Sequence, residues 1–343
     1  LENYEYIEDR KGEFALVVLV SGNYIYLSAP LNDTYTISVD NDVRIVRMIE
    51  RKFIVNNLRF KTNDQINYDS GSMIRMTACN KPIFENIRCL SAASQFIASY
   101  GTFGGSFSRL YCNDMLTKST GGLAYGFNDI SGDSNRLHDC FFSKMRHGYT
   151  TSINGLTTAG DFLSYSEYGT TRNCIISNSI AYGAANAGFD THPSAVNITF
   201  LNCHSINGFE GYSSSAAGFQ NRGIDCTYIS CSTTNCPAGF NMINSAGATN
   251  SRLINCTTRG RGLALKIGFD TNIEGGFFES SGSSANEFLA NTVINISNAT
   301  FKHNSSNASP QLFDFDSGNS IVNIKNVKFI IDANEATSYW IFK

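Results

Sequence analysis

The sequence has little charge, little proline and no long apolar run, and each of these deficits narrows its class. Charged residues make up 16% of the 343 residues, and the formal net charge is −3. This balance disfavours a disordered chain and a protein that coats nucleic acid. A membrane-spanning helix needs roughly 20 apolar residues, whereas "FALVVLV" is only long enough for a strand. We therefore expect a folded protein with no nucleic-acid partner and no membrane insertion.

Periodicity typical of helices is equally scarce. The chain consists mainly of short alternating apolar runs separated by Asn, Ser and Gly, and glycine occurs 29 times against 5 prolines. Alternation of this kind, bounded by turn residues, is typical of β-strands and predicts an all-β fold. The sequence begins at Leu1 without a signal peptide, so we expect a fragment or a processed product of a longer protein.

A repeat organises these short runs. In segments such as "ITFLNCHS" (198–205), an apolar residue is followed two positions later by a turn-type residue. The turn positions are Asn57, Asn86, Cys112, Asp139, Asn178, Asn202, Ser230, Asn255, Gly275, Asn298 and Asn326. Units of roughly 20–30 residues whose like positions stack in columns predict a solenoid. We expect a right-handed parallel β-helix of about eleven coils over residues 51–343, with capping strands that lead into it from residues 1–50.

The ten cysteines fit the same repeat. Cys140, Cys203, Cys231 and Cys256 each follow a turn position by one residue. Thiols stacked in a column behave as small buried hydrophobic groups. The sequence therefore predicts free, buried cysteines in preference to disulfides.

Most central coils carry a second strand marked by glycine and an aromatic residue. The marks are "YGFN" (125–128), "HGYT" (147–150), "AGFD" (187–190), "AGFQ" (217–220) and "AGFN" (238–241), and "LALK" (263–266) continues the series. If the aromatic residue points inward, strand alternation places the next residue on the outer face. The resulting ladder, which we expect to be exposed, is Asn128, Thr150, Asp190, Gln220, Asn241 and Lys266.

Three polar residues converge on this predicted face. Asp190 and His192 stand two residues apart in "AGFDTHPS" (187–194), and Arg222 lies one coil further along. We expect about 6–7 Å along the strand and about 4.8 Å between coils. The insertions "TTSINGLTTAGDFLSYSEYG" and "NGFEGYSSSA" flank the patch, and loops added to one face of a solenoid often build a cleft. We therefore interpret the three residues as catalytic candidates, the alternative being a solvated strand face with a surface ion pair.

The same segment carries two family resemblances. "GFDTH" resembles the Y-G-F-D-P-H strand of mannuronan C5-epimerases, in the pectate-lyase-like β-helix group, with Ala187 and Thr191 as differences. That resemblance implies that Asp190 and His192 lie at the sugar carbon that exchanges a proton. From "RHGYTT" (146–151) to "GFQNRG" (218–223), the chain looks like bacteriophage tailspike β-helices. This second resemblance implies a homotrimeric depolymerase of capsule or lipopolysaccharide, carried on the phage tail and acting at the bacterial surface.

Two reactions are compatible with the patch. In a lyase, His192 would remove the proton at C5 of a uronic acid, Arg222 would neutralise the carboxylate, and Asp190 would orient the imidazole. In a glycoside hydrolase, Asp190 and a second carboxyl group, from Glu167 or Glu210, would flank the glycosidic bond. The lyase is favoured, because the strand ladder fixes His192 and Arg222 whereas both glutamates lie on inserted loops.

The sequence also predicts residues that bind the substrate beside the catalytic candidates, and it leaves two other classes of function open. The predicted substrate-binding residues are Asn128, His147, Glu167, Glu210, Gln220, Asn241 and Lys266. His147 is equally compatible with capping a coil. No Cys/His spacing resembles a zinc site and no acidic run matches a calcium loop, so we expect no metal and no cofactor. The alternatives are a non-catalytic glycan-binding spike and a secreted bacterial polysaccharide lyase or epimerase.

Overall fold

The computed structural model describes residues 15, 17–28, 31, 53–61, 72–92, 94–115, 124–152, 170–193, 195–208, 216–242, 248–281, 286–289, 291–304, 311–315, 319–332 and 340–342. All regular structure in these residues is β-strand, β1 to β33. Within them, no helix is long and apolar enough to cross a membrane.

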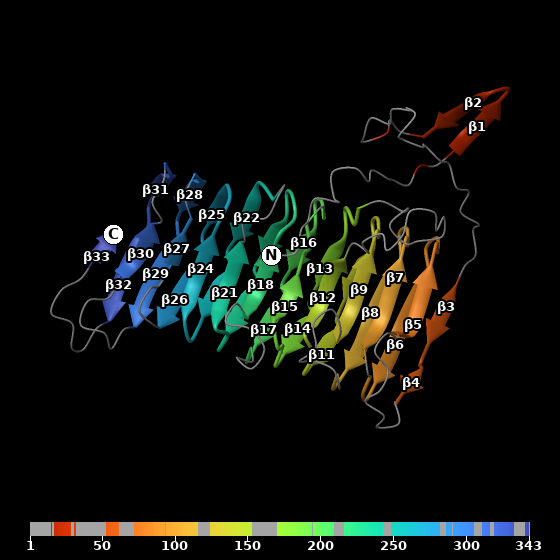
Figure 1. Cartoon of the computed structure of the whole chain (residues 1–343), viewed down its shortest axis with the longest axis horizontal. Helices are drawn as coiled ribbons and strands as arrows, with labels where there is room; N and C mark the ends of the chain where they lie inside the picture. The colour runs from red at the N-terminus through yellow and green to blue at the C-terminus, as the bar shows by residue number, and fades with distance from the viewer. Residues whose placement is uncertain are drawn as a thin grey trace, which may run out of the picture.

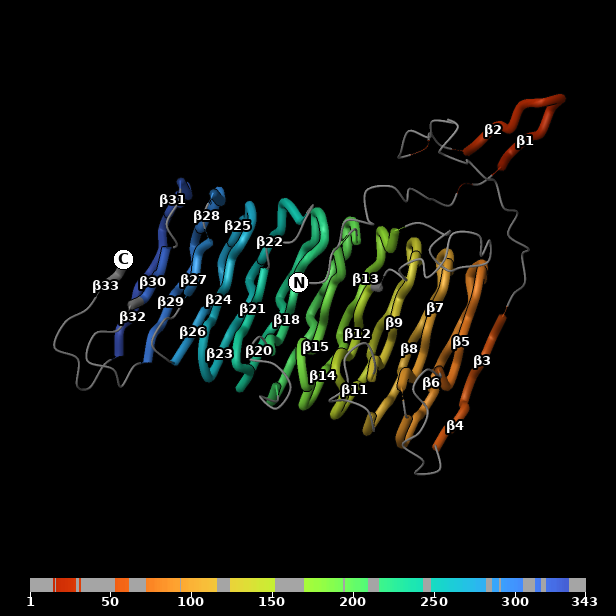
Figure 2. Tube along the Cα trace, viewed as in Figure 1, coloured from red at the N-terminus to blue at the C-terminus, as the bar shows by residue number. Residues whose placement is uncertain are grey.

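The strands from β3 to β33 stack into a parallel β-helix, which confirms the fold expected from the repeat (Figure 1). Strands of successive coils pair in parallel and form columns along the axis, as the path of the chain in Figure 2 shows. One column is an 11-stranded sheet, here called the site sheet. It comprises β5 (Ser72–Thr77), β7 (Gln95–Tyr100), β9 (Tyr125–Ile130), β12 (His147–Ser152), β15 (Ala187–Asp190), β18 (Ala217–Asn221), β21 (Ala238–Met242), β24 (Leu263–Ile267), β27 (Asn286–Phe288), β30 (Gln311–Phe315) and β33 (Trp340–Phe342).

The remaining strands of the β-helix form two further columns on either side of the bend. The first column comprises β3 (Ile54–Asn56), β6 (Ile83–Cys89), β8 (Ser106–Cys112), β10 (Arg136–His138), β13 (Ile175–Ser177), β16 (Thr199–Leu201), β19 (Thr227–Ile229), β22 (Ser251–Ile254), β25 (Thr271–Glu274), β28 (Val293–Ser297) and β31 (Ile321–Lys325). The second comprises β4 (Arg59–Phe60), β11 (Phe141–Ser143), β14 (Ile180–Tyr182), β17 (His204–Ile206), β20 (Ser232–Thr234), β23 (Thr257–Arg259), β26 (Phe277–Ser281), β29 (Thr300–Asn304) and β32 (Lys328–Asp332). Strands β6 and β8 run through the bend and join the two columns.

The bend between these columns requires a left-handed backbone, which explains the turn-type residues of the repeat. Every predicted turn position except one has positive φ, for example Asn178 at 48° and Asn202 at 51°. Asparagine tolerates this conformation, and the Asn202 amide also donates a 3.0 Å hydrogen bond to the Asn178 side chain one coil away. The exception is Cys112. In that coil the bend residue is Arg109, at φ 51°, so the sequence assignment was wrong by three residues.

The reason for this error is a local coincidence in the sequence. The segment "RLYC" also places an apolar residue, Leu110, two positions before a small residue. In the structure Leu110 pairs with Ile87, and Cys112 pairs with Cys89, both beyond the bend. Phe107 takes the apolar position before the bend, opposite Phe84.

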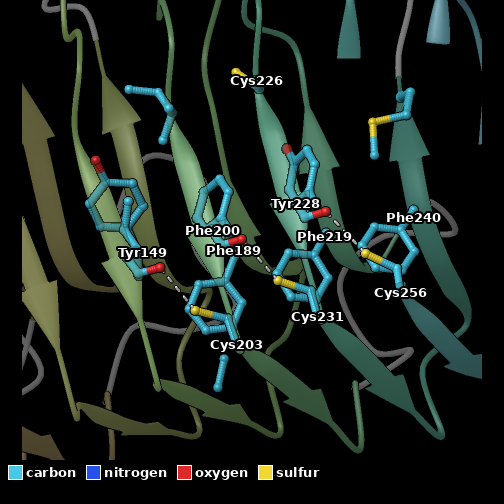
Figure 3. Packing of buried hydrophobic residues seen from close by; sticks show 14 of the residues in the cluster. Tyr149, Phe189, Phe200, Cys203, Phe219, Cys226, Tyr228, Cys231, Phe240 and Cys256 are labelled. Atoms are coloured by element: carbon cyan, nitrogen blue, oxygen red, sulfur yellow. Dashed lines mark hydrogen bonds between the residues drawn. The ribbon is translucent and has the colours of Figure 1, made fainter. Parts of the chain in front are cut away.

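The interior of the β-helix is filled by columns of aromatic rings and thiols (Figure 3). The Phe189 and Phe219 rings stack with centroids 5.0 Å apart, and Phe219 and Phe240 follow at 4.9 Å. All ten cysteines are free and nine of them are buried, as the sequence predicted. Burial raises the pKa of the Cys140 thiol to about 12, so such thiols stay protonated and act as packing groups.

The glycine before each aromatic residue allows two neighbouring columns to approach. A Cβ at Gly188 would lie 2.3 Å from Ser205 Oγ, and one at Gly218 would lie 2.2 Å from Thr233 Cγ2. Both partners are buried, so the glycine faces the interior and so does the aromatic residue that follows it. Because two consecutive residues face the interior, the usual in–out alternation of strand side chains is shifted by one position. The residue before the glycine therefore lies on the outer side.

The described part of residues 1–50 contains an antiparallel hairpin, which pairs with no other strand. It consists of β1 (Val17–Ser21) and β2 (Tyr24–Leu27), which form a two-stranded sheet of their own. The idea that residues 1–50 cap the β-helix stays a prediction, because most of that range lies outside the described residues.

Candidate functional site

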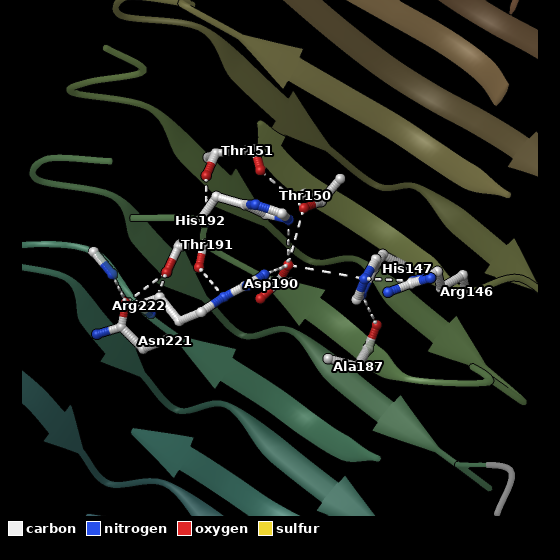
Figure 4. A network of polar contacts seen from close by, with 11 residues as sticks. Arg146, His147, Thr150, Thr151, Ala187, Asp190, Thr191, His192, Asn221 and Arg222 are labelled. Atoms are coloured by element: carbon white, nitrogen blue, oxygen red, sulfur yellow. Dashed lines mark hydrogen bonds and ion pairs between the residues drawn. The ribbon is translucent and has the colours of Figure 1, made fainter. Parts of the chain in front are cut away.

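The Asp190 carboxylate is the centre of a cluster of polar groups on the outer side of the site sheet (Figure 4). Arg222, one coil away, places Nη2 2.7 Å from Asp190 Oδ2. His192 places Nε2 3.2 Å from the same oxygen, and the Thr150 hydroxyl donates to it at 3.1 Å. The structure thus brings together the three residues that the sequence proposed as catalytic.

This cluster is buried, which corrects the expectation of an exposed ladder. Asp190 and Thr150 are 0% exposed, and the His192 and Arg222 side chains are only 22% and 11% exposed. The long side chain of Arg222 reaches back over the neighbouring coil and, with His192, covers the carboxylate. Three further residues of the predicted ladder are also buried: Asn128, Gln220 and Asn241.

Asp190 is held in its ionised form despite this burial. Loss of solvent alone raises the pKa of a buried carboxyl group, but the charge of Arg222 and the hydrogen bond from His192 act in the opposite direction. The net effect holds the pKa of Asp190 well below its usual range. A permanent negative charge is therefore present beside the His192 ring.

This charge determines the tautomer of His192. The ionised carboxylate can only accept, so His192 Nε2 carries the proton in their 3.2 Å contact. In the neutral ring Nδ1 then has the lone pair. The His192 backbone N–H donates to Thr151 Oγ1 at 2.7 Å. This hydrogen bond holds the backbone from which the imidazole side chain extends.

His147 joins the cluster from the opposite direction. A Cβ at Gly148 would contact Ala181 Cβ at 3.1 Å, and the Tyr149 ring is buried in the core, so both residues face the interior. His147 therefore lies on the outer side, 3.8 Å from Asp190 Oδ2. Simple strand alternation cannot find this position, because residues 147 and 149 would then share one face.

His147 is a neutral member of this cluster. Burial is the main cause that lowers its pKa to about 3. Its Nδ1 donates to the Ala187 carbonyl at 2.9 Å, so Nε2 is the acceptor, and Arg146 Nε donates to it at 3.4 Å. The contact with Asp190 is consequently not an ion pair, and His147 supports the site as a buried structural and acceptor group.

A second layer of hydroxyl and amide groups holds Arg222. Thr191 Oγ1 accepts from the Arg222 backbone N–H at 3.1 Å and donates to Asn221 Oδ1 at 2.5 Å. Arg222 Nε also donates to the Thr191 carbonyl at 3.3 Å. Asn221 could not be found from the sequence, because an amide that faces the interior looks like any other strand residue until its partners are known.

The other predicted substrate-binding residues occupy different positions. Gln220 and Asn241 follow Asp190 along the ladder, and Lys266 comes next. Lys266 forms an ion pair with Glu287 at 2.5 Å, about three coils or 14 Å from Asp190. Glu167 and Glu210 lie outside the described residues.

Several acceptor atoms on this face are buried and have no hydrogen-bond partner among the described residues. They include Asp190 Oδ1, Asn241 Oδ1 and Asn128 Oδ1 of the same ladder. Buried polar atoms are normally paired, so these oxygens are exceptions to that rule.

A buried carboxyl group lies inside the coil, directly beneath the site. Asp129 of β9 accepts hydrogen bonds from Asn135 Nδ2 at 3.1 Å and from the Tyr149 hydroxyl at 3.3 Å, and Cys174 Sγ lies 3.5 Å away. Tyr149 immediately precedes Thr150, which bonds to Asp190. Burial raises the pKa of Asp129 to about 6, although the hydrogen bonds act in the opposite direction.

Asp129 is expected to make the protein less stable as the pH rises. Its folded pKa of about 6 exceeds the unfolded value of about 3.9, so its favourable contribution is complete below the unfolded value. That contribution is lost as the pH rises through 6 and amounts to about 3 kcal/mol. In urea denaturation at pH 5 and pH 8, Asp129→Asn should gain stability relative to the wild type at the higher pH.

The matched control for this experiment is Asp225→Asn, which changes an exposed carboxylate to an amide. It measures how the same chemical change at the surface alters the free energy of unfolding at each pH. If Asp129→Asn shows no larger pH dependence than this control, the carboxyl group of Asp129 does not titrate as the structure indicates.

No group of three or more His, Cys, Asp and Glu side chains that could hold a metal ion occurs in the described part of the chain. The polar cluster is therefore described by its protein groups alone: an ionised carboxylate, a guanidinium, a polarised imidazole and unsatisfied acceptors.

Comparison with known proteins shows that the sequence is similar to one phage protein and the fold to another. The chain is 25% identical over 222 residues to a capsule K1-specific depolymerase of Klebsiella phage K64-1. The aligned segment covers 62% of this chain and 22% of that protein. Its fold matches the tailspike protein gp49 of Pseudomonas phage LKA1 with a TM-score of 0.69 at 16% identity, over 95% of this chain and 57% of the tailspike. No family model matches.

These comparisons show the fold and a distant relationship. The chain spans about a fifth of the length of the depolymerase that it matches, and little more than half of the tailspike. A surface adhesin of Streptococcus pneumoniae, PfbA, is also similar, but its TM-score of 0.45 is too low to support any conclusion.

Proposed function

We propose that this chain is the polysaccharide-cleaving β-helix of a phage tailspike-like depolymerase, and that the buried cluster of Asp190, His192 and Arg222 is its active site. The observation that carries the proposal is the ionised Asp190 carboxylate in contact with both an imidazole and a guanidinium. The relationship to a capsule depolymerase and to a tailspike fold supports the substrate class.

The proposed chemistry is β-elimination on an acidic polysaccharide. Arg222 would bind the uronate carboxylate and stabilise the charge that develops when the C5 proton leaves. His192 would accept that proton at Nδ1, since Asp190 holds the proton on Nε2. The C4–O4 bond would break as the C4–C5 double bond forms, and the imidazolium would return the proton to the departing O4. Asp190, buried beneath both side chains, would keep the imidazole in the orientation that this step requires.

Hydrolysis is the competing reaction, and the ladder supports it less well. The rungs on either side of Asp190 are Thr150 and Gln220, so the adjacent coils do not provide the second carboxyl group at this level that a hydrolase requires. Glu167 or Glu210 would have to supply it from outside the described residues.

The same proposal includes the assembly and location of the protein. We propose a homotrimer, carried on the phage tail, that acts at the surface of the host bacterium. The tail location is supported by the tailspike-like fold. The assembly is supported by apolar side chains exposed on the β-helix, such as Ile175 and Leu201, which association would bury.

The products of the reaction test the chemistry. The protein should be incubated with a panel of purified capsular polysaccharides, type K1 of Klebsiella among them, while reducing ends and near-ultraviolet absorbance are measured. A lyase produces both signals, because elimination leaves an unsaturated uronate. A hydrolase produces reducing ends alone. Binding without either signal would contradict the proposal and favour a glycan-binding spike.

His192→Ala is expected to lower the rate of elimination by about 10²–10⁴-fold, because the base is lost. The matched control is His138→Ala, at a 39% exposed imidazole next to the bend residue Asp139, where we expect the wild-type rate. Equal rates in the two variants would remove His192 from the mechanism.

A further inference from the structure

The hairpin formed by β1 and β2 exposes apolar side chains on both of its faces. Leu19 lies opposite Tyr26, and Val20 lies opposite Ile25. Opposite residues of an antiparallel pair share a face, and adjacent pairs lie on opposite faces. The exposed fractions include 63% for Val20 and 72% for Tyr24. Among the described residues, no part of the core covers either face of the hairpin.

Figures 1 and 2 show this hairpin standing apart from the coils, above the end of the β-helix that β3 forms. A two-stranded hairpin is marginally stable at best in water, and a contiguous exposed apolar surface marks an interaction site. Its two strands also have open edges that can accept another strand. The hairpin consequently requires a partner.

The amino-acid composition of the hairpin indicates which kind of surface can bind it. Residues 15–28, "ALVVLVSGNYIYLS", contain no charged side chain, so neither an acidic polysaccharide nor a charged protein surface complements them. A second copy of the hairpin is complementary, since its apolar faces can pack on the same apolar faces and its open edges can pair with open edges. Rotational symmetry makes such a contact recur in every copy.

The small size of the hairpin favours contact with more than one other copy. Its strands contribute five and four residues, whereas a standard interface takes about 20–30 residues from each partner. Three hairpins around one axis double the contact of each, because every hairpin touches two others. The first coils can add to it, because Phe53 and Ile54 are also exposed at that end of the β-helix.

We infer that the hairpin is a self-association element, whose occupants are the hairpins of other copies of this chain. This inference rests on the homotrimer proposed above and is independent of the proposed chemistry. It assigns to residues 17–27 a role in assembly that requires no contact with the β-helix of the same chain.

Sedimentation velocity over the micromolar range tests the inference on the whole chain. The test variant is Val20→Asp with Tyr26→Asp, one change on each face; the control, Val20→Ile with Tyr26→Phe, keeps both faces apolar. The test variant should raise the dissociation constant by about a hundredfold or more, since it removes buried apolar area and brings like charges together. The control should assemble as the wild type does.

Circular dichroism should be identical for all three proteins, because the altered side chains are exposed in the single chain. If the wild type assembles and the test variant assembles equally well, the inference is wrong while the homotrimer stands. If the wild type is a monomer throughout, both are wrong. A lower melting temperature of the test variant would then indicate that the hairpin packs on its own chain, and an unchanged one that it binds a different molecule.

Discussion

Asp190→Asn is expected to reduce polysaccharide cleavage by about 10²–10⁴-fold or more, under either of the two reactions. The amide removes the charge that polarises His192 and pairs with Arg222. The amide oxygen can still accept a hydrogen bond from Arg222, and the side chains are nearly isosteric. We therefore expect the fold to be retained, with some loss of stability because the Arg222 charge is left buried and unbalanced.

The measurement is the initial rate of depolymerisation, at a temperature well below the melting transition of each variant. Asp139→Asn is the matched control, because it makes the same chemical change at a bend position with positive φ, where asparagine is the commoner residue of the repeat. If Asp190→Asn cleaves at the wild-type rate with an unchanged circular dichroism spectrum, the cluster is a structural feature and catalysis occurs elsewhere.

Arg222→Ala is expected to cost about 3–5 kcal/mol of unfolding free energy, because it leaves the Asp190 carboxylate buried without its cation. The exposed pair of Arg109 and Glu85 offers a matched control. Arg109→Ala removes the same chemical group from a solvated ion pair and should cost at most about 1 kcal/mol. Urea denaturation of the two variants measures the contrast directly.

The cost of Arg222→Ala should also depend on pH in a defined direction. In the wild type the pKa of Asp190 is depressed, so its stabilising contribution is present above the unfolded pKa of about 3.9. It is lost only as the pH falls through the depressed folded value. Without Arg222, burial dominates, and the carboxyl group protonates more readily.

The difference in stability between the wild type and Arg222→Ala should therefore shrink between pH 8 and pH 5. The double variant Asp190→Asn with Arg222→Ala should recover part of the loss, because it contains no buried charge at this position. A double variant that is less stable than Arg222→Ala alone would show that Asp190 stabilises the fold without its arginine.

The fold could be read from the sequence because stacking forces like positions into columns. A residue that suits the bend of one coil must suit the bend of the next, so asparagine recurs there with positive φ. The same logic placed Asp190, His192 and Arg222 on one face of adjacent coils. It failed at Cys112, because two stretches of that coil match the local pattern and only the pairing with β6 distinguishes them.

The burial and protonation of the site could not be read in this way, because they depend on contacts between coils. Arg222 covers Asp190 from 32 residues away, and His147 approaches from 40 residues away to bond with Ala187. His147 reaches the cluster only because Gly148 and Tyr149 both face the interior. The sequence by itself determined which residues share a coil position and therefore a face. The tertiary structure alone decided which of them lose solvent, since desolvation and charge pairing are properties of the packed coils and not of any one strand.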